Sequence, residues 1–395
     1  MMIHQNLLEV TVHKASSNQT VEQAERNADF WVFGGIFRPV WLEALPQKHI
    51  ERVAIDARAD GNFRMDVFLG KTMNKGELVA QVKTMDGRDY GSPIRKPIHK
   101  QDSLRLNATF ASPALWSSEF PNRYQVEVTL LENGQLKHRL TEKFGFRTAE
   151  LRPGDGFYVN GEKIRFKGVN RHCHWPTSGR ATNATISLND ALLIKEMNMN
   201  AVRMSHYPPD KHFLEICDSL GLYVIDEADI ESHGPVEFYY EENTDENKFN
   251  HWNESIADNP VWETSILDRV QSCVIRDKNR PCVLIWSMGN ESAYGCNFEE
   301  ALAWTKAFDE SRLTHYESAF YRNSSKTYDF SNLDLYSRMY PTFEDMTKYL
   351  ESEPDKPFIL CEYCHSMGNG PGDLEDYFAF FHENELMCGG FVWEW

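Results

Sequence analysis

The chain has 395 residues, of which 41% are hydrophobic and 13% aromatic, and this size predicts a globular protein of two or three domains. Its formal net charge of −18 argues against nucleic-acid or anionic-membrane partners, because phosphate binding requires a basic face. No run of about 18 apolar residues occurs, so the sequence predicts no membrane span. No signal peptide is visible, which predicts a cytoplasmic protein, or a periplasmic one if the true N-terminus is missing.

Residues 1–45 hold an alternating strand pattern at Leu7–Val12, a polar loop, and a second apolar stretch over 29–42. Two or three strands cannot cover their own apolar faces. We therefore expect this segment to be the end of a larger β-sandwich.

Residues 46–148 show short alternating strands separated by turn signals. Asp86-Gly87 and Asn133-Gly134 are typical of tight hairpins. About 100 residues of this pattern predict an immunoglobulin-like β-sandwich, which we interpret as a support domain.

From residue 149 to 395 the pattern changes to apolar strands that alternate with amphipathic helices. The eight predicted strands are Ile164–Val169, Ala201–Ser205, Leu222–Asp226, Val283–Ser287, Thr314–Ser318, Leu333–Met339, Phe358–Cys361 and Gly390–Trp393. Eight such units predict a (β/α)8 TIM barrel. The chain stops at Trp395, so we expect this barrel to lack its last helix. The eight cysteines all lie in this half of the chain, and without a second closely spaced pair beside Cys361 and Cys364 we expect reduced thiols, which favour a reducing compartment.

Two strands of similar design each end in a glutamate, Glu291 after Val283–Ser287 and Glu362 after Phe358–Cys361. Catalytic side chains of TIM barrels lie at the C-terminal ends of the strands, and retaining glycoside hydrolysis requires two carboxylates. A phenol beside a carboxylate can hold it ionised, and Tyr340 leaves the neighbouring strand. We therefore favour Glu362 as the nucleophile and Glu291 as the acid/base, with strand capping or ion pairing as the alternative for each.

Glu231 and His233 share one face of an extended chain, so both can bind one ion. Together with Glu291 they favour Mg²⁺ or Mn²⁺ over Zn²⁺, and an ordinary loop is the alternative. His172, His206 and His365 follow strand ends and predict hydrogen-bond donors to sugar hydroxyls. Arg203 predicts a buried ion pair. Trp393 and Trp395 predict stacking platforms, with core packing as the alternative.

Several of these stretches resemble glycoside hydrolase family 2, and within it most closely the β-galactosidases. They are Gly168–His172, Ser205–Pro208, Asp226–Gly234, Trp286–Ser292 and Cys361–Asn369. The earlier stretch Gly35–Arg38 resembles the last part of that family's jelly-roll sugar-binding domain. The resemblance thus covers the chain from the end of a jelly roll to the eighth barrel strand.

The resemblance implies a role for each matching position. It implies Glu362 as nucleophile, Glu291 as acid/base and Tyr340 as the assisting tyrosine. It implies a magnesium site formed by Glu231, His233 and Glu291. The positions that it implies for the galactosyl group are Asp29, His172, His206, Asn290, His365 and Trp393, with Asp29 also bound to sodium.

The sequence also departs from the family pattern. Cys173 stands where the family usually has Glu, and Trp175 where it often has His. Most of the jelly roll and the domains after the barrel are absent, so we expect an incomplete sodium site. The expected partner is a β-galactoside, and a homo-oligomer of the full-length form is left open. The alternatives are a β-glucuronidase or β-mannosidase, and an inactive carbohydrate-binding fragment.

Overall fold

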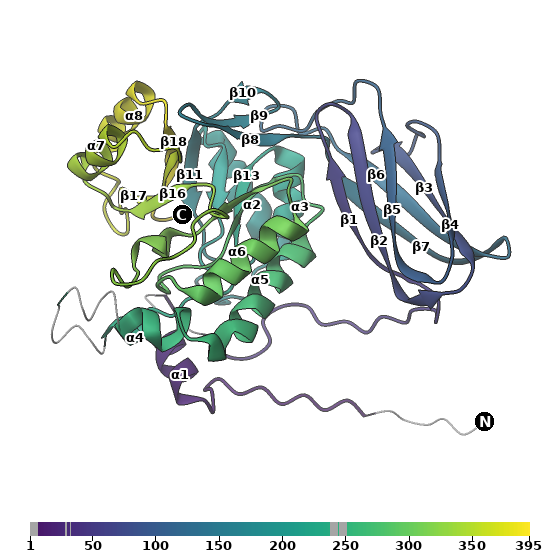
Figure 1. Ribbon diagram of the computed structural model, residues 1–395, viewed down its shortest axis with the longest axis horizontal. Coiled ribbons are helices and arrows are strands. Elements are labelled where there is room, and N and C mark those ends of the chain that lie inside the picture. The colour runs from purple at the N-terminus through teal and green to yellow at the C-terminus, as the bar shows by residue number, and fades with distance from the viewer. Residues whose placement is uncertain (1–6, 28–29, 32, 238–243, 245–250) are drawn as a thin grey trace.

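The computed structural model describes residues 7–27, 30–31, 33–237, 244 and 251–395. A β-sandwich lies beside an α/β barrel, and the N-terminal segment runs past both (Figure 1). No helix in the described part of the chain is both long and apolar enough to cross a membrane.

The sandwich consists of two antiparallel sheets. One sheet contains β1 (Ile50–Ala57), β2 (Asn62–Met73) and β5 (Gln101–Thr109). The other contains β4 (Ile94–Ile98), β3 (Gly76–Thr84), β6 (Tyr124–Glu132) and β7 (Gln135–Phe144). Inward residues such as Met65, Val67 and Leu78 are buried, as period-two alternation requires. Asn133 and Gly134, with φ of 51° and 74°, form the predicted turn between β6 and β7.

A small antiparallel sheet precedes the barrel, formed by β8 (Ala149–Arg152), β9 (Gly156–Val159) and β10 (Glu162–Lys163). The barrel strands are β11 (Phe166–Asn170), β12 (Ala201–Arg203), β13 (Tyr223–Glu227), β14 (Val283–Ser287), β15 (Leu313–His315), β16 (Tyr336–Met339), β17 (Phe358–Tyr363) and β18 (Met387–Val392). They form one parallel sheet in the order β15-β14-β13-β12-β11-β18-β17-β16, which is a nearly closed barrel. The predicted TIM barrel is therefore confirmed, and its strands shift by one to three residues from most of the predicted bounds.

Helices follow most of these strands and cover the outside of the barrel (Figure 1). They are α2 (Ala184–Glu196), α3 (Lys211–Leu220), α5 (Glu263–Asp277), α6 (Cys296–Phe308), α7 (Phe343–Glu351) and α8 (Leu374–Glu383). The short helix α4 (Gly234–Glu237) and a 3₁₀ turn at Pro260–Trp262 precede α5. Between β15 and β16 the connection contains only a 3₁₀ helix, Glu317–Phe320. The eight cysteines are all free thiols, as predicted.

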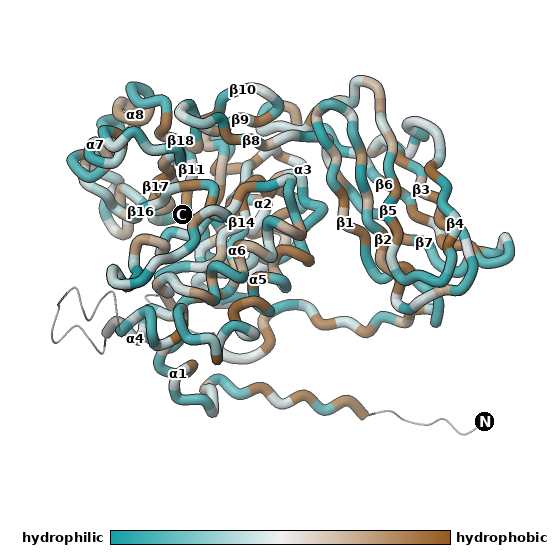
Figure 2. Tube along the Cα trace, in the orientation of Figure 1, coloured by the Kyte–Doolittle hydropathy of each residue, from teal (hydrophilic) through white to brown (hydrophobic). Residues whose placement is uncertain are grey.

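The N-terminal segment differs from the prediction. The predicted strand at Leu7–Val12 does not form, and the described residues between 7 and 49 contain no strand. Within the predicted polar loop the chain instead forms α1 (Gln19–Arg26), because Asn18 caps it by accepting from the N–H groups of Thr20 and Val21. Apolar residues line this extended trace (Figure 2) and are exposed. Within the described residues the trace has no partner strand, and a strand is stable only when it pairs with others in a sheet.

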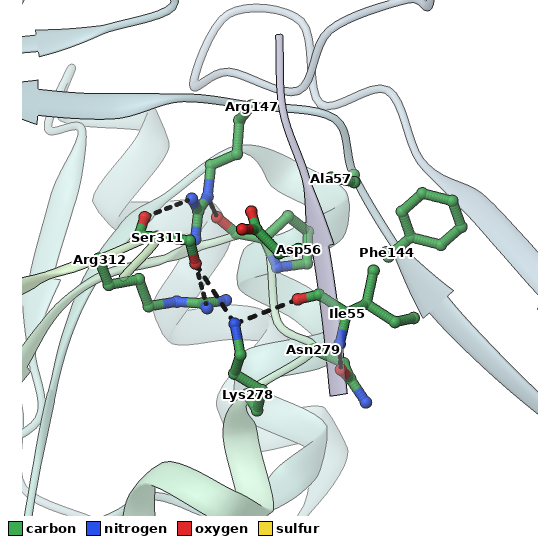
Figure 3. Close-up of a pocket in the computed structure, with 11 residues that line it drawn as sticks. Ile55, Asp56, Ala57, Phe144, Arg147, Lys278, Asn279, Ser311 and Arg312 are labelled. Atoms are coloured by element: carbon green, nitrogen blue, oxygen red, sulfur yellow. Dashed lines mark hydrogen bonds between the residues drawn. The ribbon is translucent and has the colours of Figure 1, made fainter. Parts of the chain in front are cut away.

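The sandwich contacts the barrel through a buried polar cluster at the start of β14 (Figure 3). Arg147 donates to the carbonyl oxygens of Pro281 and Val283 at 2.6 and 2.7 Å. Lys278 Nζ binds Asp309 Oδ1 at 2.8 Å and the carbonyl of Ile55, on β1, at 3.2 Å. Burial lowers the pKa of Arg147 to about 9 and that of Lys278 to about 8. This contact lies at the N-terminal end of the barrel strands, away from the strand ends that carry the predicted site.

Candidate active site

Glu362, at the end of β17, is held by a cation and a phenol. Its Oε1 accepts from Arg203 Nη1 at 2.8 Å, and its Oε2 accepts from the Tyr340 hydroxyl at 3.0 Å. Tyr340 follows β16 and its backbone N–H donates to the Glu362 carbonyl at 2.9 Å. Both carboxylate oxygens are therefore fixed in direction, which is what a reaction at one oxygen requires.

Arg203, the last residue of β12, is fully buried and binds several groups at once. Its Nε and Nη2 donate to the two oxygens of Glu227, at 2.9 and 3.1 Å. Its Nη2 also donates to Asn290 Oδ1 at 2.9 Å. The predicted ion pair of Arg203 is confirmed, and the planar guanidinium joins the ends of four barrel elements.

Burial raises the pKa of Glu362 to about 8, although Arg203 acts in the opposite direction and Glu291 adds to the rise. Burial also raises the pKa of Glu227 against the effect of Arg203. The predicted hydrogen bond from Tyr340 to Glu362 is present, but burial has the larger effect on the pKa of Glu362. Burial therefore opposes the ionised form of Glu362, which Arg203 favours.

Glu291 lies on the loop after β14 and contacts a second set of residues. Its Oε2 is 2.7 Å from His233 Nδ1. Burial acts to raise the pKa of Glu291, but the His233 hydrogen bond and charge bring it below its ordinary value. Ligand atoms of Glu231, His233 and Glu291 all lie within 4.8 Å of one another. Two carboxylates and an imidazole at this spacing are a donor set that fits Mg²⁺ or Mn²⁺.

Asn290 links the two groups of residues. Its Oδ1 accepts from Arg203, and its Nδ2 donates to Glu231 Oε2 at 2.7 Å. The same amide therefore orients a carboxylate of the metal-type cluster and the guanidinium that binds Glu362.

Imidazole and indole rings pack together beside Glu227. His206 Nδ1 is 2.8 Å from Glu227 Oε1, and its ring stacks on Trp393 with centroids 5.3 Å apart. His172 lies 5.4 Å from His206, centroid to centroid, and its Nδ1 contacts the Tyr207 hydroxyl at 3.1 Å. Burial lowers the pKa of both histidines well below the ordinary value, so both are neutral imidazoles.

The predicted residue His365 takes no part in the ring contacts among His172, His206 and Trp393. His365 is exposed, and its ring lies 6.1 Å from that of Tyr340, centroid to centroid. Asp29 lies outside the described residues. Trp395 is half-buried, and its backbone N–H donates to the Asn170 carbonyl at 3.0 Å.

Two further buried carboxylates lie among these residues and were not predicted from the sequence. Glu227 ends β13 and binds Arg203, His206 and Ser287 Oγ. Glu317 follows β15 and accepts from the backbone N–H of Glu291 at 2.8 Å. Burial raises the pKa of Glu317 to about 7. Both residues carry the signal that identified Glu291 and Glu362, a carboxylate at the C-terminal end of a barrel strand.

The comparisons with known proteins agree with this architecture. A model described as "Glycosyl hydrolases family 2, TIM barrel domain" matches residues 150–395, and one described as "Glycosyl hydrolases family 2" matches residues 48–147. The chain is 36% identical to a β-galactosidase of Actinobacillus pleuropneumoniae and 35% identical to one of Kluyveromyces lactis, each over 99% of this chain. It spans 39% and 41% of the length of these two relatives.

Solved structures share the fold at lower identity. A glycosyl hydrolase family 2 member from Bacteroides cellulosilyticus is 20% identical, with a TM-score of 0.69 over 88% of this chain and 46% of that one. A β-glucuronidase of Ruminococcus gnavus is 18% identical, with a TM-score of 0.72 over 89% of this chain and 63% of that one. With family models that match the sandwich and the whole barrel, this chain belongs to glycosyl hydrolase family 2.

Proposed function

We propose that the chain carries the catalytic centre of a retaining β-galactosidase. The observation that carries the proposal is Glu362, whose two oxygens are fixed by Arg203 and Tyr340 while Glu291 stands on a separate loop beside His233. Two carboxylates in different surroundings are what glycoside hydrolysis requires, and the retaining course is inferred from the family to which the chain belongs. The galactoside preference is supported by the curated relatives named β-galactosidase.

In the proposed reaction, the ionised Glu362 attacks the anomeric carbon while the bond to the leaving oxygen breaks. Glu291 donates its proton to that oxygen, and the aglycone departs as an alcohol. Glu291 then removes a proton from water, which attacks the anomeric carbon and releases the sugar and the Glu362 carboxylate. Neutral His172 and His206 would bind sugar hydroxyls, and Trp393 would pack against the sugar.

Glu231, His233 and Glu291 would hold a Mg²⁺ or Mn²⁺ ion, which supplies positive charge beside the acid/base when bound. The sodium site implied by the resemblance involves Asp29, which lies outside the described residues. Asn290 would bind the 2-hydroxyl of the sugar through its amide.

The test is hydrolysis of o-nitrophenyl β-galactoside by the purified chain with Mg²⁺, compared with Glu362→Gln. Glu375→Gln, on the exposed face of α8, is the matched control. We expect turnover by the parent chain and the control, loss in Glu362→Gln, and release of the β-anomer first. A folded chain without turnover would overturn the proposal and favour a carbohydrate-binding fragment. Faster turnover of the β-glucuronide or β-mannoside would assign it to a different glycosidase.

A further inference from the structure

The loop that carries Glu291 has an unfavourable backbone. Glu291 and Ala293 have φ of 34° and 57°, in the left-handed region that residues with a Cβ atom rarely adopt. Each such residue costs on the order of 1 kcal/mol or more, so surrounding contacts must hold the loop in place.

The segment after β15 supplies these contacts. Each loop residue from 291 to 294 is hydrogen-bonded to residues 316–321. The four bonds run from Glu291 N–H to Glu317 Oε1 at 2.8 Å, from Ser292 N–H to Ser318 Oγ at 3.2 Å, from the Tyr316 hydroxyl to the Ala293 carbonyl at 2.6 Å, and from Tyr294 N–H to the Tyr321 carbonyl at 2.8 Å. The loop thus lies along this segment.

Glu317 is unlike the other members of this set. It is a carboxylate that is only 2% exposed, and burying a carboxylate costs more than burying a neutral acceptor that could make the same bond. Its Oε1 accepts from the backbone N–H of Glu291 itself and from the Ser318 hydroxyl, and the carboxylate interacts electrostatically with both Glu291 and Glu362. A neutral acceptor at position 317 could bind the Glu291 N–H and stabilise the loop equally well, so loop stability alone does not explain a carboxylate there.

We propose that Glu317 is a positioning residue for Glu291, which it holds by binding the Glu291 N–H so that the acid/base carboxylate faces the leaving oxygen. The consequence for catalysis rests on the proposed function, whereas the hydrogen bond itself does not. The bond from Tyr316 to Ala293 and the bond from Tyr294 to Tyr321 do not involve Glu317, so they still join the loop to residues 316–321 when Glu317 is replaced. Glu317 therefore acts on the direction of the Glu291 side chain more than on formation of the loop.

The kinetic test compares two leaving groups. Glu317→Leu removes the acceptor, and Glu317→Gln keeps an oxygen in its place. An alkyl β-galactoside needs a proton on its leaving oxygen, whereas 2,4-dinitrophenolate leaves without one. Because general acid catalysis contributes about 10²–10⁴-fold, we expect kcat/KM of Glu317→Leu to fall roughly 100-fold for the alkyl substrate and under about threefold for the dinitrophenyl substrate.

Glu317→Gln should recover most of the alkyl activity. Tyr316→Phe is the matched control, because it removes a bond to the same loop without touching Glu291. We expect Tyr316→Phe to lower both activities by the same factor. Equal losses for the two substrates in Glu317→Leu, or no loss at all, would overturn the proposal.

Amide hydrogen exchange at Glu291 tests the bond without turnover. We expect slow exchange in the parent chain and in Glu317→Gln, and exchange at least tenfold faster in Glu317→Leu. Unchanged exchange in Glu317→Leu would overturn the positioning role. A parent chain that hydrolyses no galactoside would overturn the proposed function, and exchange would still decide the role of Glu317.

Discussion

Arg203 Nη1 lies 2.8 Å from Glu362 Oε1, and the two side chains are 0% and 6% exposed. The same guanidinium binds both oxygens of Glu227. One cation therefore neutralises two buried carboxylates, and its removal leaves both without their counter-charge.

Arg203→Met should destabilise the chain by about 3–5 kcal/mol, because it leaves Glu227 and Glu362 buried without a cation. This corresponds to a drop in Tm of roughly 5 °C for a protein of this size. The control is Arg105→Met, because Arg105 makes a similar two-point contact with Asp66 but is 54% exposed. The control should lose at most about 1 kcal/mol. Similar losses in the two variants, measured by thermal unfolding, would contradict the role of Arg203.

Glu362→Gln should stabilise the chain at alkaline pH. Burial raises the pKa of Glu362 to about 8, above its ordinary 4.5, so the folded state holds the proton more tightly than the unfolded state. Below pH 4.5 both states are protonated and the burial of charge costs nothing. Between pH 4.5 and 8 the cost grows, and above pH 8 it is complete, on the order of a few kcal/mol.

The measurement for this prediction is the Tm of Glu362→Gln minus that of the parent chain, at pH 5 and pH 8.5. We expect the difference to be more positive at pH 8.5. Glu375→Gln, which is exposed, should show no such trend. A difference that is constant, or larger at pH 5, would show that Arg203 outweighs burial at this carboxylate.

Tyr340→Phe should lower kcat with little change in stability. The hydroxyl donates to Glu362 Oε2 at 3.0 Å, and a hydrogen bond to a charged group is worth about 1.5–3 kcal/mol, or roughly 10–100-fold in rate. Tyr340 is 44% exposed, so its fold contribution is small. Tyr336→Phe is the control, because that ring stacks on Tyr349 at 3.9 Å instead. The measurements are kcat for o-nitrophenyl β-galactoside and the Tm of each variant. A kcat of Tyr340→Phe equal to that of Tyr336→Phe and the parent chain would contradict the prediction.

Mg²⁺ or Mn²⁺ should raise the Tm of the parent chain, because an ion that binds only the folded state stabilises it by about 2.7 kcal/mol at 100 times its Kd. Glu231→Gln and His233→Ala should abolish most of this rise, since they remove ligands from a cluster within 4.8 Å. His382→Ala, in the last turn of α8, should keep it. Electron paramagnetic resonance gives an independent measurement of the number of Mn²⁺ ions bound per chain. An equal Tm rise in all four proteins would place the ion elsewhere.

The sequence could predict the barrel because buried parallel strands read as continuous apolar runs, and the residues after each run meet at one end. This placed Glu291, Glu362 and Tyr340 together without a structure. Glu227 and Glu317 also lie at the ends of barrel strands. The sequence alone did not show that Arg203 binds Glu227 or that the Glu291 N–H binds Glu317. Such contacts join residues far apart in the chain.

Two other features depend on tertiary context. The alternating pattern at Leu7–Val12 is typical of a strand, yet a strand forms only beside another strand, so the pattern did not determine the structure. The pKa of Glu362 depends on burial and on the balance of Arg203 against neighbouring carboxylates. The sequence predicts the hydrogen bond between Tyr340 and Glu362. It does not predict whether burial or Arg203 has the larger effect on the pKa of Glu362.

Arg147→Met should weaken the contact between the sandwich and the barrel. Arg147 (Figure 3) is 4% exposed and donates to the carbonyls of Pro281 and Val283. Because Arg312 Nε also donates to the Val283 carbonyl, the loss of Arg147 leaves the buried Pro281 carbonyl without this bond, at about 1–3 kcal/mol. Arg139→Met on β7 is the control, because Arg139 is half exposed and lies 3.8 Å from Glu127. We expect a Tm lower by several degrees in Arg147→Met, a change under about 1 °C in the control, and faster proteolysis between the sandwich and the barrel. If the two variants unfold alike, these hydrogen bonds do not stabilise the contact, and the apolar surfaces around them do.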